Sequence, residues 1–137
     1  MEKRNPIILI HGLWNTSSIF SSITSKLDDI GIEYFAPTLK HSYGMTSIID
    51  LTNTLNDLIL EKYGLEKELD ILGFSMGGII GRNWIQKFNG YKRTRRFISV
   101  GSPHKGTLIA QIVPKYPFRG ISEMKINSKF LRELADN

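Results

Sequence analysis

The sequence predicts an α/β fold built on a doubly wound, mainly parallel sheet. Four short apolar segments alternate with stretches of helical spacing, in the order strand, helix, strand, helix, strand, helix, strand. No internal repeat or low-complexity segment interrupts the 137 residues. A chain of this length can bury one core, so we expect a single domain over residues 1–137.

Each element follows from a local pattern. The run Ile7 to Ile10 is continuously apolar behind Asn5-Pro6, which indicates a strand buried on both faces. A helix over 19–30 is expected to begin at a Thr16 or Ser17 cap and to stop at Gly31. By the same criteria we expect strands at 32–36, 69–73 and 96–101. We expect helices at 48–63, 107–113 and 128–135, and a further helix that begins just after Ser75 and closes at Asn89-Gly90. Residues 114–120 are expected to form a loop.

Composition excludes several classes of protein. The chain is 41% hydrophobic and 23% charged, as in soluble globular proteins, and has no cysteine for a disulfide or a zinc-thiolate site. Its N-terminal apolar run is too short for a signal peptide, and no stretch reaches transmembrane length. The histidines His11, His41 and His104 lack zinc-ligand spacing. We therefore expect a cytoplasmic protein without stable membrane insertion, cofactor or metal.

The net charge of +5 comes largely from one cluster, Lys92, Arg93, Arg95 and Arg96. A nucleic-acid surface would need interleaved aromatic residues and a recognition element, and neither is present. We expect a solvated loop here and no nucleic-acid partner.

The pattern Gly73-x-Ser75-x-Gly77 lies between an apolar strand and a helix, the context of a nucleophile elbow. Such a turn strains the serine backbone and exposes its hydroxyl, and the glycines permit close packing of strand and helix. The alternative interpretation of this pattern is a glycine-rich strand-to-helix turn whose serine is merely exposed to solvent.

Ligands bind such sheets beyond the carboxyl ends of the strands. There we expect four segments to meet: 11–15, 37–44, Ser75 and 102–107. A serine nucleophile needs donors for the developing oxyanion. The N–H of Met76, at the start of the helix, and that of Leu13, after Gly12, are the predicted donors.

Three ordered segments resemble the α/β-hydrolase superfamily, and more narrowly small bacterial triacylglycerol lipases and carboxylesterases. They are Asn5-Pro6-Ile7-Ile8-Leu9-Ile10-His11-Gly12-Leu13, Gly73-Phe74-Ser75-Met76-Gly77-Gly78, and Gly101-Ser102-Pro103-His104-Lys105-Gly106-Thr107. The resemblance implies that Ser75 is the nucleophile and that Leu13 and Met76 form the oxyanion hole. It also implies hydrolysis of a small-molecule ester or lipid, such as an acylglycerol, through an acyl-serine intermediate.

The sequence departs from the family order of serine, acid, histidine. The only histidine after Ser75 is His104, and no acid lies between them. The chain is expected to correspond to the N-terminal two-thirds of such an enzyme, lacking the last strands and with an incomplete triad. Asp70 cannot orient a base, because five strand residues place it about 16 Å from Ser75.

The sequence alone does not decide the roles of the histidines. The resemblance implies that His104 shapes the crevice, with a role as base as the alternative, and His41 is a second candidate base. His11 is expected to anchor the oxyanion loop.

Two functions remain: an esterase or lipase, and a non-catalytic binding or interaction module with the same fold. A sheet without its last strands has an open edge, which predicts self-association or binding of a complementing segment.

Overall fold

The sheet has four parallel strands in the order β2-β1-β3-β4. The computed structural model describes residues 3–41, 44–107, 110 and 119–136. The strands are β1 (Ile7–Ile10), β2 (Tyr34–Phe35), β3 (Leu69–Phe74) and β4 (Thr94–Val100). This order confirms the predicted parallel α/β architecture.

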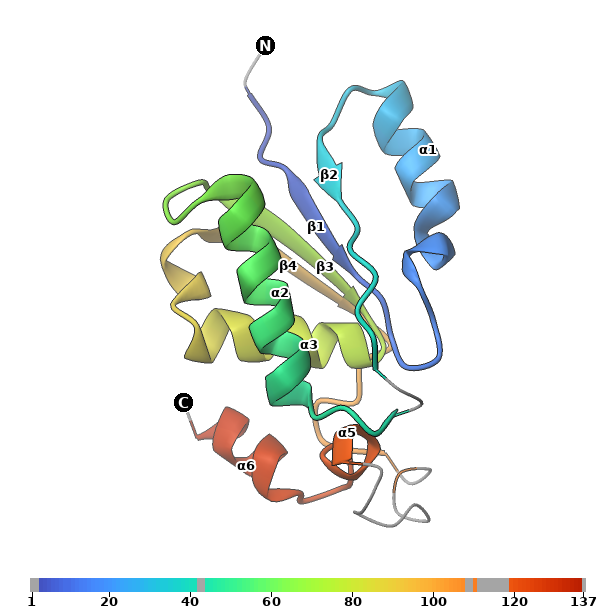
Figure 1. The fold of residues 1–137 in the computed structure, drawn as a ribbon, viewed down its shortest axis with the longest axis vertical. Helices are drawn as coiled ribbons and strands as arrows, with labels where there is room; N and C mark the ends of the chain where they lie inside the picture. The colour runs from blue at the N-terminus through green and yellow to red at the C-terminus, as the bar shows by residue number, and fades with distance from the viewer. Residues whose placement is uncertain (1–2, 42–43, 108–109, 111–118, 137) are drawn as a thin grey trace.

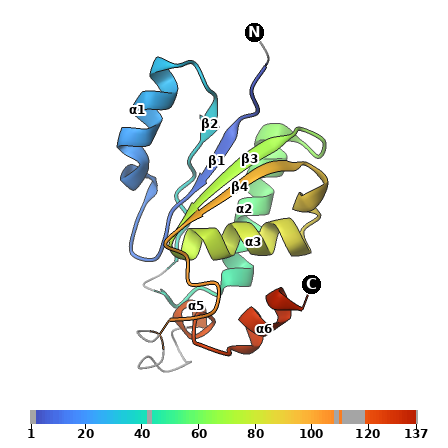
Figure 2. The same cartoon turned by 180° about the vertical axis from the view of Figure 1, so that it is seen from behind.

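Helices cover both faces of the sheet, as the doubly wound prediction requires (Figures 1 and 2). One face carries α1 (Ser21–Asp29), preceded by the short 3₁₀ helix η1 (Ser17–Phe20). The other carries α2 (Ile48–Tyr63) and α3 (Met76–Lys87). Further helical segments are η3 (Gly90–Lys92), α5 (Arg119–Ser122) and α6 (Lys129–Ala135).

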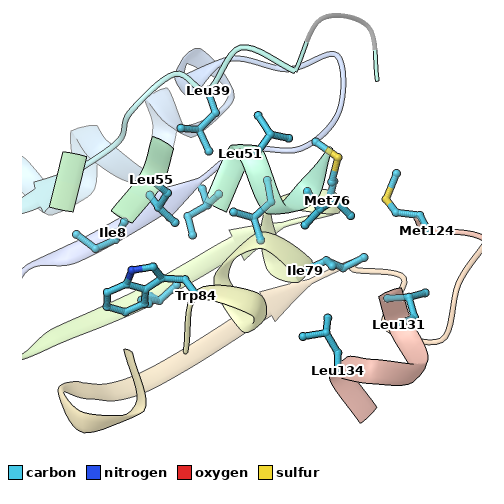
Figure 3. Packing of buried hydrophobic residues seen from close by; sticks show 14 of the residues in the cluster. Ile8, Leu39, Leu51, Leu55, Met76, Ile79, Trp84, Met124, Leu131 and Leu134 are labelled. Carbon is cyan, nitrogen blue, oxygen red and sulfur yellow. The ribbon is translucent and has the colours of Figure 1, made fainter. Parts of the chain in front are cut away.

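The alternation of side chains along each strand divides the core in two. Leu9 on β1 packs with Phe20 and Leu27 beneath α1. Ile8 and Ile10 instead enter the larger cluster beneath α2 and α3. Figure 3 shows that Met124, Leu131 and Leu134 of the C-terminal segment join this larger cluster beside Met76 and Ile79.

The N-terminus of α2 is capped twice. The Ser47 hydroxyl accepts from the Asp50 N–H at 3.1 Å, an ordinary serine cap. In addition, Glu123 Oε1 accepts from the Ile48 N–H at 2.9 Å. A carboxylate is favourable there because the helix dipole is positive at its N-terminus. The segment after α5 is therefore tied to α2 by a polar contact as well as by the core.

Several element boundaries differ from the sequence prediction. The second strand has only two residues, and the helix expected at 19–30 begins as η1. Helix α3, by contrast, starts at Met76, directly after the elbow, where its N-terminus was expected. Arg119 and Gly120, expected in a loop, belong to α5, and Gly120 packs closely against the Thr46 backbone. Most of the helix expected at 107–113, and the remainder of the loop at 114–120, lie outside the described residues.

The basic cluster matches the predicted solvated loop only in part: Lys92, Arg95 and Arg96 are exposed, but Arg93 is buried and Arg95 and Arg96 belong to β4. Arg93 is 7% exposed, donates to the Gly64 carbonyl at 2.6 Å and lies over the Trp84 ring. Its planar guanidinium suits both contacts. Arg95 lies in β4 and pairs with Glu68. Two of the four cations therefore have structural partners.

Candidate active site

Ser75 has the strained backbone that the elbow predicts. It joins β3 to α3 with φ 55° and ψ −126°, in the left-handed half of conformational space that serine rarely occupies. Serine at a helix N-terminus usually caps the helix with its hydroxyl. Here the side chain makes no capping hydrogen bond. The hydroxyl therefore remains available to a bound molecule.

The elbow glycines are required by close packing. A Cβ atom on Gly77 would lie 2.1 Å from the Ile10 carbonyl oxygen, and one on Gly73 would lie 2.4 Å from Cα of Gly78. Both distances are far below van der Waals contact, and the opposing atoms belong to the backbone. The glycines therefore allow α3 to start directly against the ends of β1 and β3.

The loop after β1 lies directly against Ser75. A Cβ atom on Gly12 would lie 2.9 Å from the Ser75 Cβ and 3.2 Å from the Asn15 side-chain oxygen. Among the described residues, no backbone hydrogen bond takes up the N–H of Leu13 or of Met76. Two backbone donors beside the serine are the arrangement an oxyanion requires.

His11 joins this loop to the segment after β2. Its Nε2 accepts from the Leu39 N–H at 2.8 Å, and its Nδ1 donates to the Gly12 carbonyl at 2.8 Å. Both ring nitrogens are therefore occupied by backbone groups. This geometry supports the anchoring role expected for His11.

His41 lies edge-on to His11, with the ring centroids 6.2 Å apart. Burial lowers its pKa, the nearby His11 lowers it further, and a hydrogen bond with the Asn15 backbone partly offsets both. The neutral ring is therefore favoured. Its Nδ1 is buried and has no hydrogen-bond partner within the part of the chain that the structure describes.

His104 is bound away from Ser75. Its Nε2 lies 2.8 Å from the Ser99 hydroxyl, and its Nδ1 lies 3.5 Å from Nη1 of Arg82. Because the guanidinium only donates, Nδ1 is the acceptor and Nε2 carries the proton. Burial lowers the pKa of His104, and the Arg82 charge lowers it further. These contacts favour a role in shaping the crevice over a role as base.

As the sequence predicted, Asp70 does not lie beside Ser75. Asp70 lies at the opposite end of β3, where its N–H donates to the Pro6 carbonyl at 3.0 Å. Among the described residues, no group of three or more metal-ligating side chains could hold an ion. Within the same residues, no helix combines the length and apolar composition of a membrane span.

Sequence reasoning missed the partners that hold these loops. Arg82 contacts His104 across 22 positions, and Glu123 caps α2 across 75 positions. Neither pair belongs to a motif with fixed spacing. Ser99 was the nearer signal, because it lies two residues before the recognised Gly101–Thr107 segment, which contains His104.

The comparisons with known proteins agree with this geometry. The sequence model of the palmitoyl protein thioesterase family matches residues 6–135. The chain belongs to the palmitoyl protein thioesterase family. This α/β-hydrolase-type membership confirms the resemblance inferred from the three sequence segments. No curated protein matches the chain significantly.

Solved structures share the fold with this member of the palmitoyl protein thioesterase family. The Bacillus licheniformis lipase BlEst2 in mature form has a TM-score of 0.72 and 18% identity, covering 99% of this chain and 60% of its own. An extracellular α/β-hydrolase from a Paenibacillus species has a TM-score of 0.66 and 22% identity, with coverages of 85% and 49%. Phospholipase PlaB from Legionella pneumophila has a TM-score of 0.80 and 13% identity, with coverages of 97% and 33%.

These similarities define the fold as that of esterases and lipases. The chain spans between 33% and 60% of the lengths of these three proteins. The activity of the longer proteins therefore enters below as a proposal.

Proposed function

We propose that this chain hydrolyses acyl esters or acyl thioesters, with Ser75 as the nucleophile. The observation that carries the proposal is the strained Ser75 packed against Gly12. The neighbouring N–H groups of Leu13 and Met76 have no backbone partner among the described residues. Ester and thioester carbonyls form the same tetrahedral oxyanion, so one pair of donors serves both substrates. A thioester substrate is favoured because the chain belongs to the palmitoyl protein thioesterase family. An ester substrate is favoured because a lipase shares the fold.

The reaction proceeds in two steps. The Ser75 oxygen attacks the acyl carbonyl carbon, and the alcohol or thiol leaves with a proton while an acyl-serine forms. Water then attacks the acyl-serine, which releases the carboxylic acid and restores the hydroxyl. Leu13 and Met76 donate to the oxyanion in both steps. No cofactor takes part.

Both steps need a proton acceptor. His11 and His104 have both ring nitrogens occupied, whereas Nδ1 of His41 has no partner among the described residues. Among the three histidines of the chain, His41 is therefore the candidate base, because it alone keeps a ring nitrogen without a partner among the described residues. The alternative is that a histidine of a complementing polypeptide segment accepts the proton.

Labelling with a fluorophosphonate tests the nucleophile directly. The phosphorus forms a bond to the serine oxygen and fluoride leaves, so only an activated serine reacts. We expect a mass-spectrometric adduct on the peptide containing Ser75. Ser75→Ala should abolish the adduct, and Ser22→Ala, on the exposed surface of α1, should leave it unchanged. An unlabelled Ser75 after long exposure contradicts the proposal.

His41→Gln tests the base, and substrate comparison tests the leaving group. If His41 accepts the proton, the rate of labelling falls by at least about tenfold. An unchanged rate assigns the base to another segment. An aryl ester and an acyl thioester of the same chain length then show which leaving group is preferred.

A non-catalytic acyl-binding module is the second candidate. It is favoured by one observation, that neither His11 nor His104 is hydrogen-bonded to Ser75. Saturable binding of a non-hydrolysable acyl ligand, combined with no labelling at Ser75, would establish this alternative.

A further inference from the structure

Trp14 combines a strained backbone with a largely exposed side chain. Its φ of 59° lies in the left-handed region, where a bulky residue is an outlier. The Asn15 N–H donates to the Gly12 carbonyl at 3.3 Å, which closes a turn with Trp14 as its third residue. Glycine and asparagine usually occupy a turn position of positive φ. A tryptophan at this position therefore costs backbone energy.

Packing of the indole does not offset this strain. The Trp14 side chain is 64% exposed, and its ring makes no aromatic or cation–π contact among the described residues. Trp84, the other tryptophan of the chain, is 1% exposed and donates to the Asn56 side chain at 3.0 Å. Strained residues that the fold does not use for packing are typical of ligand-binding sites.

Trp14 lies at the rim of the candidate active site. It directly follows Leu13, whose N–H is a proposed oxyanion donor, and Gly12 packs against Ser75. The connection from β1 to η1, which carries these residues, extends beyond the carboxyl ends of the strands (Figure 1). When a substrate carbonyl binds at Leu13, the chain attached to it therefore begins one residue away from Trp14.

The surroundings of Trp14 are apolar and uncharged. Residues 6–25 contain no Asp, Glu, Lys or Arg. Leu13 packs against the larger core cluster, and a Cβ atom on Gly44 would lie 3.4 Å from Leu13 Cδ1. Met45, the residue after Gly44, is 41% exposed. This part of the site therefore suits an alkyl chain better than a charged group.

We propose that Trp14 binds the acyl chain of the substrate and makes the site selective for long chains. The inference rests on the proposed function, because it requires the carbonyl to be bound by Leu13 and Met76. The indole is a large, rigid apolar surface, and an alkyl chain that covers it removes apolar area from water. A short acyl group ends before it reaches the indole. Only a long chain gains this contact.

Substitutions at Trp14 separate the indole from the backbone strain. Trp14→Ala removes the indole and keeps a Cβ atom at positive φ, whereas Trp14→Gly removes both. Urea unfolding should therefore have a higher midpoint for Trp14→Gly than for Trp14→Ala. In both variants the ratio of long-chain to short-chain ester hydrolysis should fall by about tenfold, which corresponds to lost contact with about two methylene groups. Trp14→Phe should retain part of this ratio.

Tyr91→Ala is the matched control. Tyr91 is 60% exposed and lies in η3, before the amino end of β4. This variant also removes an exposed aromatic ring, but at the opposite end of the sheet, so its ratio should equal that of the native chain. A ratio unchanged in Trp14→Ala, or lowered equally in Tyr91→Ala, overturns the proposal.

Binding can be measured without catalysis, because Trp14 is its own fluorescent reporter. Methyl decyl ketone has a long alkyl chain on a carbonyl that cannot be hydrolysed, and methyl ethyl ketone is its short-chain counterpart. Iodide quenches the exposed Trp14 and not the buried Trp84. We expect the long ketone, below its solubility limit, to protect Trp14 from iodide saturably and to shift its emission to shorter wavelength. The short ketone at the same concentration should do neither, and Trp14→Phe should show no response.

The outcomes separate this inference from the proposed function. A protected Trp14 in a chain whose Ser75 is not labelled by fluorophosphonate supports the acyl site and rejects hydrolysis. A labelled Ser75 with a Trp14 that does not respond to the long ketone supports hydrolysis and overturns the acyl site. Equal protection by both ketones also overturns it. So does protection by phosphatidylcholine vesicles alone, which would assign the indole to a lipid surface.

Discussion

At the scale of single residues, Ser75 is the most constrained position in the site. Its positive φ is fixed by the close approach of Gly73 and Gly77 to neighbouring backbone, not by a hydrogen bond of its own side chain. Strain of this kind costs on the order of 1–3 kcal/mol and persists only where the surroundings impose it. The conformation of Ser75 is therefore maintained at the expense of stability.

Replacing Ser75 should reveal this strain. Ser75→Gly is expected to be more stable than Ser75→Ala by about 1 kcal/mol, because glycine adopts positive φ without a Cβ clash. Urea unfolding of both variants measures the difference. At Ser22, inside α1, the order should reverse, since glycine is less favourable than alanine in a helix. A Ser75→Gly variant no more stable than Ser75→Ala would show that the backbone is unstrained.

The histidines give stability a pH dependence of defined sign. The pKa values of His41 and His104 are lowered in the folded chain from the ordinary 6.5, mainly by burial. Below that value the unfolded chain binds protons that the folded chain does not. The stabilising contribution of the neutral rings is therefore complete above pH 6.5 and is lost as pH falls through the lowered pKa values.

The free energy of unfolding should therefore decrease between about pH 7.5 and about pH 5.5. His104→Gln removes one of the two titrating groups while retaining a polar side chain beside Ser99 and Arg82. Urea unfolding at both pH values should give a smaller difference for His104→Gln than for the native chain. Equal differences would show that the surroundings of His104 do not disfavour its charged form.

At the scale of elements, α3 is placed by glycines on one side of the helix. Gly77 and Gly81 are four positions apart and both face the sheet. Their surroundings differ in kind. Gly77 faces the backbone of β1, whereas Gly81 faces the flexible ends of side chains, among them the Ile71 methyl group at 3.2 Å from an added Cβ. The backbone atoms around Gly77 cannot move aside for an added Cβ, whereas the side-chain atoms around Gly81 can.

The two glycines should respond differently to alanine. Gly77→Ala is expected to lower the free energy of unfolding by about 3 kcal/mol, because its Cβ would overlap the Ile10 carbonyl. Gly81→Ala should lie within about 1 kcal/mol of the native chain, since better helix propensity offsets the small rearrangement. Denaturant titration of both variants tests this. Similar losses at both positions would argue against close backbone packing at the elbow.

At the scale of the whole molecule, local patterns predicted the parallel sheet because each strand and helix has its own periodicity. The Gly73–Gly77 motif also predicted the elbow, since its geometry depends on neighbours in sequence. The arrangement of the histidines could not be predicted in this way. Whether His104 points to Ser75 or to Ser99 depends on Arg82, which enters from another element. The short helix α5 was missed because its four residues, Arg119–Ser122, are too few to show a helical periodicity.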